Sequence, residues 1–114
     1  MGPVNVLLVD DDASVRRLLT VALSLEEGFE VREARDGADA LRICAEFKPD
    51  VIFLDYWMPD MDGCVTAARI REVYPEARIV VFSGVVESTP EWADACVVKG
   101  RSAGVDRLID LARD

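Results

Sequence analysis

Residues 51–63 read VIFLDYWMPDMDG, which is an apolar run, an aspartate, and then a turn rich in proline, aspartate and glycine. A short continuous apolar run bounded by turn residues is typical of a strand that is covered on both faces of a sheet. The turn leads into a stretch whose apolar residues, Ala67, Ile70 and Tyr74, recur at helical spacing. The segment therefore predicts a buried strand at 51–54, a loop that begins at Asp55, and a helix after Gly63.

Working outward in both directions, apolar runs and amphipathic stretches alternate along the whole chain. We expect strands at 4–9, 29–33, 51–54, 79–82 and 96–98. The strand at 29–33 alternates apolar with polar residues, which favours an edge position. The apolar positions at helical spacing should face the core: Val15, Leu18, Leu19, Ala22 and Leu23; Ala40, Ile43, Cys44 and Phe47; Ala67, Ile70 and Tyr74; Val105, Leu108, Ile109 and Ala112.

Strands that alternate with helices are joined by right-handed crossovers, which gives a parallel sheet with helices on both faces. No repeat, low-complexity tract or linker divides residues 1–114, so we expect one α/β domain. In such sheets the ligand site lies at the carboxyl ends of the strands, where the strand order reverses. Functional residues should therefore be sought just after each strand.

Composition narrows the class of protein. Hydrophobic residues make up 51% of the chain and charged residues 31%, and no apolar run reaches the length of a membrane span. The N-terminus lacks the basic and apolar segments of an export signal, so we expect a soluble, cytoplasmic domain without a membrane partner. The formal net charge of −9 repels phosphate backbones, so this segment should not bind nucleic acid directly.

The three cysteines, Cys44, Cys64 and Cys96, are widely spaced, and the chain has no histidine. Neither the spacing nor the residue types suit a zinc site. We expect buried, reduced thiols without a redox role.

Polar residues follow four of the predicted strands. The first strand is followed by Asp10, Asp11 and Asp12, the third by Asp55, the fourth by Ser83 and the fifth by Lys99. Asp12 is interpreted as the N-cap of the first helix. Taken singly, Lys99 would be an ordinary surface lysine and Ser83 a loop or capping hydroxyl, so the argument depends on the joint pattern.

Carboxylates that follow adjacent strands repel each other unless a cation compensates. Mg²⁺ binds through one or two carboxylates, waters and a substrate phosphate, so Asp10, Asp11 and Asp55 would suit it, together with a backbone carbonyl from the following turn. Asp55, on the central strand, is the best candidate for a nucleophile that attacks phosphorus. Lys99 and the Ser83 hydroxyl could bind phosphoryl oxygens, and Gly84 would leave room for the incoming group.

These residues resemble the receiver domain of bacterial two-component response regulators. The resemblance is carried by the acidic run with Arg16 after it, the stretch LDYWMPDMDG at 54–63, the Ser83-Gly84 pair, and Lys99. It spans essentially the whole chain, and the motif that contains Asp55 is the most specific part. It implies a flavodoxin-like, doubly wound sheet of five parallel strands in the order 2-1-3-4-5.

The resemblance also implies roles. Asp55 would be the phosphoacceptor, and Asp10, Asp11, Asp55 and the backbone carbonyl of Trp57 would bind Mg²⁺ or Mn²⁺. Lys99 would pair with the phosphoryl group and Ser83 would be the switch hydroxyl. The donor would be a sensor histidine kinase or a phosphotransfer protein, and the domain would catalyse its own phosphotransfer and a slow hydrolysis.

The chain departs from the family pattern after Ser83. The usual aromatic on the fifth strand is replaced by Cys96, and the usual proline after the lysine by Gly100. The stretch between Ser83 and Lys99 is short. Residues 88–91 read STPE, a helix start, but room remains for only one or two turns before the next strand. We therefore expect a short or irregular fourth helix, an altered output surface and a partly exposed Trp92.

Several alternatives remain. Trp57 could shield an aspartyl phosphate from water or simply lie on the surface. The domain could be a phosphorylation-independent interaction module, which the residues at 96 and 100 would favour. A phosphatase of the haloacid dehalogenase type would need an acid where Trp57 stands, and the acidic first loop disfavours a flavin. The sequence does not identify the kinase, the effector domain or downstream protein, or whether the domain forms a homodimer.

Overall fold

The structure is a computed structural model that describes residues 2–56, 62–84, 88–99 and 104–113. Strands and helices alternate through most of it. The strands are β1 (Val4–Val9), β2 (Phe29–Ala34), β3 (Val51–Leu54), β4 (Arg78–Ser83) and β5 (Ala95–Val98). The described helices are α1 (Ala13–Ser24), α2 (Gly37–Phe47), α3 (Gly63–Val73) and α4 (Gly104–Arg113). The predicted strands are confirmed to within one residue at each end.

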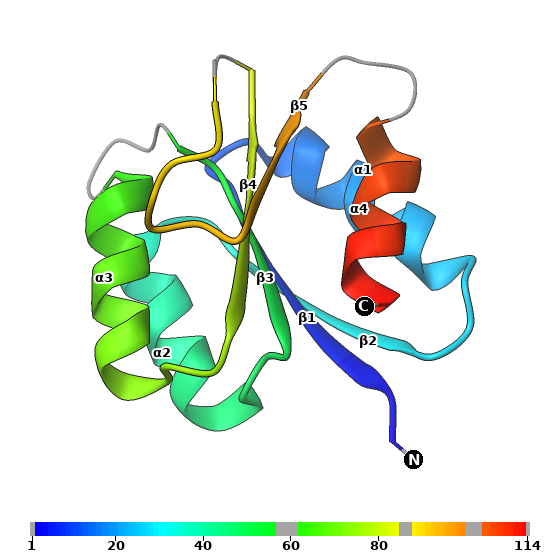
Figure 1. The fold of residues 1–114 in the computed structure, drawn as a ribbon. Helices are drawn as coiled ribbons and strands as arrows, with labels where there is room; N and C mark the ends of the chain where they lie inside the picture. The colour runs from blue at the N-terminus through cyan, green and yellow to red at the C-terminus, as the bar shows by residue number, and fades with distance from the viewer. Residues whose placement is uncertain (1, 57–61, 85–87, 100–103, 114) are drawn as a thin grey trace.

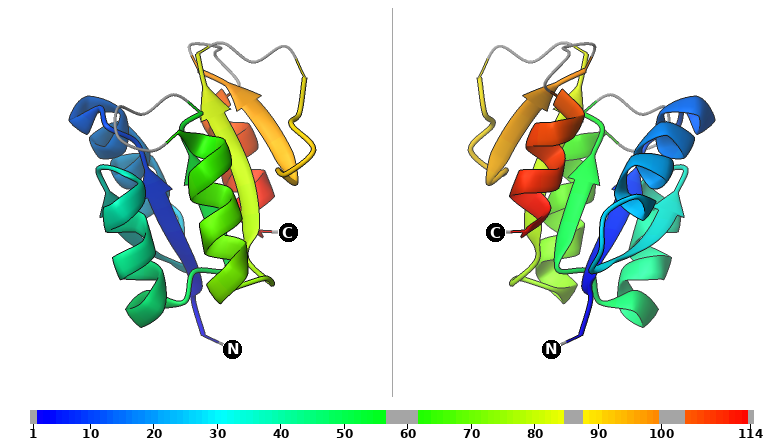
Figure 2. Two further views of the ribbon diagram at one scale, coloured as in Figure 1. Left: turned by 90° about the vertical axis from the view of Figure 1, so that its left-hand side faces the viewer. Right: turned by 90° about the vertical axis from the view of Figure 1, so that its right-hand side faces the viewer.

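The sheet has the order β2-β1-β3-β4-β5, and all four strand pairs are parallel. Helices α2 and α3 cover one face of the sheet, and α1 and α4 cover the other (Figure 1). The views from the two sides show α2 and α3 in front of the sheet on one side and α1 and α4 in front of it on the other (Figure 2). The flavodoxin-like fold, its strand order and the edge position of the second strand are thus confirmed.

The core consists of two clusters, one on each face of the sheet. Successive residues of β1 alternate between them: Leu7 and Val9 lie under α2 and α3, and Val6 and Leu8 under α1 and α4. A strand that is covered on both faces needs apolar residues at every position, which is why these runs are unbroken. Each such side chain stabilises the fold by about 1.5–3 kcal/mol relative to exposure.

Aspartates begin three of the helices. The carboxylate of Asp12 accepts a hydrogen bond from the backbone N–H of Ser14, and Asp36 and Asp62 cap α2 and α3 in the same way. Each such bond satisfies a backbone donor that the first helical turn leaves unpaired. The interpretation of Asp12 as an N-cap is confirmed.

Two expectations about burial are wrong. Leu18 was expected in the core, but 57% of it is exposed, because the buried stripe of α1 runs through Leu19 and Leu23 and the adjacent position points away from it. Of the cysteines, only Cys44 is buried: Cys96 is half-buried, and Cys64 is exposed because it lies on the outer side of α3. Burial raises the pKa of the Cys44 thiol to about 11.

The connection between β4 and β5 holds no helix in the part that the structure describes, residue 84 and residues 88–94. The expectation of a short or irregular fourth helix is therefore confirmed. The prediction that residues 88–91 begin a helix is wrong. The N–H of Ala93 bonds to the carbonyl of Pro90 at 3.1 Å, and this bond closes a single turn that does not continue as a helix. Trp92 is half-buried, as expected. Among the described residues, no helix has the length and hydrophobicity needed to cross a membrane.

Candidate functional site

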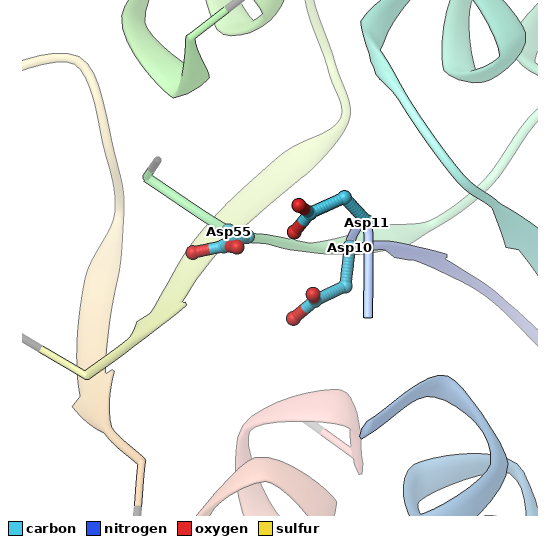
Figure 3. A group of neighbouring side chains, drawn as sticks. All are labelled: Asp10, Asp11 and Asp55. Carbon is cyan, nitrogen blue, oxygen red and sulfur yellow. The ribbon is translucent and has the colours of Figure 1, made fainter. Parts of the chain in front are cut away.

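Three carboxylates meet at the carboxyl ends of β1 and β3. Asp10 and Asp11 follow β1 and Asp55 follows β3, and each can offer an oxygen within 4.8 Å of the others (Figure 3). The backbone holds them there, because the N–H of Asp55 bonds to the carbonyl of Val9 at 2.9 Å and that of Asp10 to the carbonyl of Ala34 at 3.1 Å. The strand pairing thus continues past the strand ends and aligns the acids.

The three acids differ in environment. Asp10 and Asp55 are only 4% and 7% exposed, whereas Asp11 faces solvent. One oxygen of Asp10 accepts a hydrogen bond from the backbone N–H of Asp12 at 2.9 Å. Two nearly buried acids therefore form the floor of the site, and Asp11 lies at its open side.

Lys99 joins this group from the end of β5. Its ammonium lies 2.6 Å from an oxygen of Asp10 and 3.6 Å from an oxygen of Asp55, with the ring of Phe82 5.7 Å away. Its backbone N–H bonds to the carbonyl of Ser83 at 2.9 Å. The lysine thus connects both buried acids to the end of β4.

The other predicted site residues are placed as follows. Ser83 is 1% exposed at the end of β4, opposite Val98 in the register. Gly84 is exposed, and a Cβ there would meet no atom within 4 Å, so space at this position does not depend on glycine. Cys96 lies on β5 opposite Val81 of β4, and burial raises the pKa of its thiol. Trp57 lies outside the described residues.

The charges of the site suit a divalent cation. The formal charge of the site is −2, because three carboxylates, Asp10, Asp11 and Asp55, face one ammonium, that of Lys99. All the ligand atoms are carboxylate oxygens, the type that Mg²⁺ and Mn²⁺ prefer. The exposed Asp11 leaves one side open to water and phosphate. The residues therefore fit a divalent cation such as Mg²⁺.

Sequence reasoning gave no role to Arg16 and overlooked the packing around Asp55. The guanidinium of Arg16 donates to the backbone carbonyl of Asp10 at 2.6 Å and pairs with Glu33 at 3.2 Å, so it fixes the acidic loop against β2. A Cβ on Gly63 would lie 2.9 Å from the carbonyl oxygen of Asp55, so α3 begins against the site. The glycine in the sequence was the one signal of this close approach.

The family model of the response regulator receiver domain matches residues 6–109. The chain belongs to this family. It is therefore a receiver domain of two-component signal transduction, as the sequence resemblance indicated. Receiver domains bind Mg²⁺ at an acidic pocket and interact with histidine kinases and effector domains.

Curated relatives support membership of the receiver family. The chain is 39% identical over 115 residues to protein-glutamate methylesterase/protein-glutamine glutaminase 5 of Myxococcus xanthus, a match covering all of this chain and 33% of that protein. It is 35% identical to the response regulator protein VraR of Staphylococcus epidermidis, over 93% of this chain and 48% of that protein. This receiver domain thus spans between a third and a half of these relatives.

Among solved structures, the receiver domain of the putative response regulator NarL from Mycobacterium tuberculosis superposes with a TM-score of 0.83 at 31% identity, covering 99% of this chain and 98% of that one. The chemotaxis protein CheY4 of Vibrio cholerae gives a TM-score of 0.83 at 30% identity, with 98% of each chain covered. Both likenesses extend over the whole receiver domain.

Proposed function

We propose that residues 1–114 form one receiver domain in which Asp55 accepts a phosphoryl group while Asp10, Asp11 and Asp55 hold Mg²⁺ or Mn²⁺. The observation that supports this is the cluster of three carboxylates with Lys99 beside two of them. The metal would neutralise the acids and let a phosphate approach them.

In the transfer step, an oxygen of Asp55 attacks the phosphorus of a phosphohistidine. The new O–P bond forms as the P–N bond breaks, and the electron pair of that bond stays on the donor's imidazole nitrogen. Catalysis of such a step consists mainly of alignment and of neutralising charge on the equatorial oxygens. Lys99, 3.6 Å from Asp55, is close enough to bond one of them after a small movement.

The switch follows from the same contacts. A phosphoryl group on Asp55 adds negative charge and strong acceptor oxygens. Lys99 would shift from Asp10 toward these oxygens, and the Ser83 hydroxyl would turn to bond another. Because the backbone of Lys99 is bonded to that of Ser83, the ends of β4 and β5 would move together. The two arrangements need differ by only a few kcal/mol for phosphorylation to shift the population.

The partners are proposed from the same chemistry. Residues 1–114 contain no histidine, so the donor histidine lies outside them, and we infer that a sensor histidine kinase or a phosphotransfer protein supplies it. The phosphorylated domain would then act on an effector domain or a downstream protein. Formation of a homodimer is one way in which it could do so. We infer that the domain acts in the cytoplasm, because it would meet such a donor there.

The test is the intact mass after incubation with acetyl phosphate and Mg²⁺. We expect the mass of one added phosphoryl group on the wild type and none on Asp55→Asn. Lys99→Ala should be phosphorylated at least tenfold more slowly. A wild-type chain that stays unmodified would support the alternative, a phosphorylation-independent interaction module.

A further inference from the structure

Residues 88–94, which we call the strap, occupy the place where a fourth helix was expected. Arg71 of α3 fixes the strap, since its guanidinium lies 3.1 Å from the carbonyl oxygen of Trp92 and 3.1 Å from a carboxylate oxygen of Asp94. Asp94 is also joined twice to Ile79 of β4, through its carboxylate and its backbone N–H, both at 2.8 Å. The strap is therefore a defined element, bonded to both α3 and β4.

The strap places an aromatic side chain beside the phosphorylation site. The ring of Trp92 lies 5.8 Å from that of Tyr56, centroid to centroid, with the planes inclined by 36°. A Cβ on Gly63 would come within 3.3 Å of the Trp92 ring. Tyr56 directly follows Asp55, and its carbonyl accepts a hydrogen bond from Gly63 at 2.8 Å. Trp92 thus packs against both ends of the loop that runs from Asp55 to α3.

We propose that the Tyr56–Trp92 contact is a latch that holds the strap in its resting position and is released when Asp55 is phosphorylated. The strap follows Ser83 and Gly84 closely in the chain. A movement of the end of β4 toward the phosphoryl group would therefore displace the strap. The strap's other end leads directly into β5. The latch therefore links Asp55 to the segment between β4 and β5, a link that Cys96 on β5 has no ring to provide. This inference rests on the proposed function of Asp55.

Thermodynamic linkage gives the latch a measurable effect. If the contact exists only in the resting state, removing it lowers the free energy needed to reach the activated state, and a ligand that selects the activated state binds more tightly. An aromatic pair contributes enough to change such an affinity by about two- to tenfold. Beryllofluoride with Mg²⁺, which mimics a phosphoryl group on Asp55, is a suitable probe.

The affinity for beryllofluoride is measured by fluorine NMR and calorimetry on wild type, Trp92→Ala, Trp92→Phe and Tyr74→Ala. Tyr74 is the matched control, because it is a half-buried aromatic that packs against the same core cluster as Trp92 but follows the other end of α3. We expect Trp92→Ala to bind two- to tenfold more tightly, Trp92→Phe to remain near wild type, and Tyr74→Ala to lose stability without a change in affinity. Unchanged or weaker binding by Trp92→Ala, or equal tightening by Tyr74→Ala, would overturn the latch.

Fluorescence provides a second readout. The chain has two tryptophans, so Trp57→Phe leaves Trp92 as the sole reporter. We expect its emission to change on adding beryllofluoride and Mg²⁺, and to be unresponsive when Asp55→Asn is also present. A constant emission with bound beryllofluoride would contradict release of the latch. Absence of beryllofluoride binding and of phosphorylation by mass would instead overturn the proposed function itself.

Discussion

The three consecutive aspartates Asp10, Asp11 and Asp12 have different roles. Asp10 is nearly buried and bonded to Lys99, Asp11 faces solvent at the open side of the metal site, and Asp12 caps α1. What separates them is the direction of each side chain where the strand ends and the helix begins. Neutralising each acid in turn should therefore have a different effect.

Asp12→Asn should alter the acid response of the fold and little else. Hydrogen bonds from the hydroxyl and then the N–H of Ser14 hold the pKa of Asp12 below its ordinary value of 3.8. A depressed pKa stabilises the fold above the unfolded value, and this contribution is lost as the pH falls from there through the folded value. Asparagine caps a helix about as well but does not titrate.

Urea midpoints of wild type and Asp12→Asn should therefore agree at neutral pH, and the wild type should lose more stability as the pH falls below 3.8. Parallel curves down to the acid limit would show that the capping bonds do not distinguish the two charge states of Asp12.

Gly63→Ala should damage both the fold and the site. The added Cβ would lie 2.9 Å from the carbonyl oxygen of Asp55 and 3.0 Å from the Cα of Tyr56, and backbone atoms cannot move aside cheaply. Overpacking of this kind costs roughly 1–3 kcal/mol. Chemical denaturation should show that loss, and phosphorylation by acetyl phosphate should slow.

Gly84→Ala is the stability control for this prediction, because a Cβ there meets nothing within 4 Å. Its free energy of unfolding should not fall. If Gly63→Ala were as stable as wild type, α3 would have room to move away from Asp55.

At the scale of secondary-structure elements, the sequence predicts the sheet well because each strand is a short apolar run ended by polar residues. It predicts helix faces less well, since adjacent apolar residues such as Leu18 and Leu19 both fit the helical period. It fails at the strap, where the local pattern STPE favours a helix. Bonds of Asp94 to Ile79 and Arg71, distant in sequence, hold the strap in a different conformation.

The candidate site shows the same division. The placement of the acids, Ser83 and Lys99 at one edge of the sheet could be predicted, because the fold brings the strand ends together there. The packing of Trp92 on Tyr56 could not, because no periodic pattern places an irregular segment. The local sequence pattern therefore predicts the site residues that follow strands. The position of Trp92 depends on contacts between residues distant in sequence.

Leu18→Ala and Leu19→Ala test the orientation of α1. Leu18 is 57% exposed and Leu19 3% exposed, so the two substitutions differ mainly in the buried volume that they remove. Leu19→Ala should destabilise the domain by about 2–5 kcal/mol, and Leu18→Ala by less than about 1 kcal/mol. Urea unfolding measures both. Equal losses would mean that α1 is rotated about its axis relative to the structure.

At the scale of the whole molecule, the carboxyl ends of β1, β3 and β5 lie at one end of the sheet, and the three acids and Lys99 meet there (Figures 1 and 3). The net charge of −9 attracts cations to the entire surface. A test of Mg²⁺ binding must therefore separate the specific site from this general attraction. An acid on a distant helix offers the comparison, because its removal changes the net charge by the same amount.

Mg²⁺ should stabilise the domain through Asp10 and Asp55. A ligand that binds only the folded state adds about 2.7 kcal/mol at a free concentration a hundredfold above its Kd. We expect Mg²⁺ to raise the Tm of the wild type by several degrees, and the rise to be lost in Asp10→Asn and Asp55→Asn. Asp110→Asn, on the exposed side of α4, should keep it. Each rise is the difference between scans with and without Mg²⁺ for the same variant, so changes in intrinsic stability cancel. A rise that is equal in all four proteins would mean that Mg²⁺ acts through the net charge and that the three carboxylates do not form a metal site.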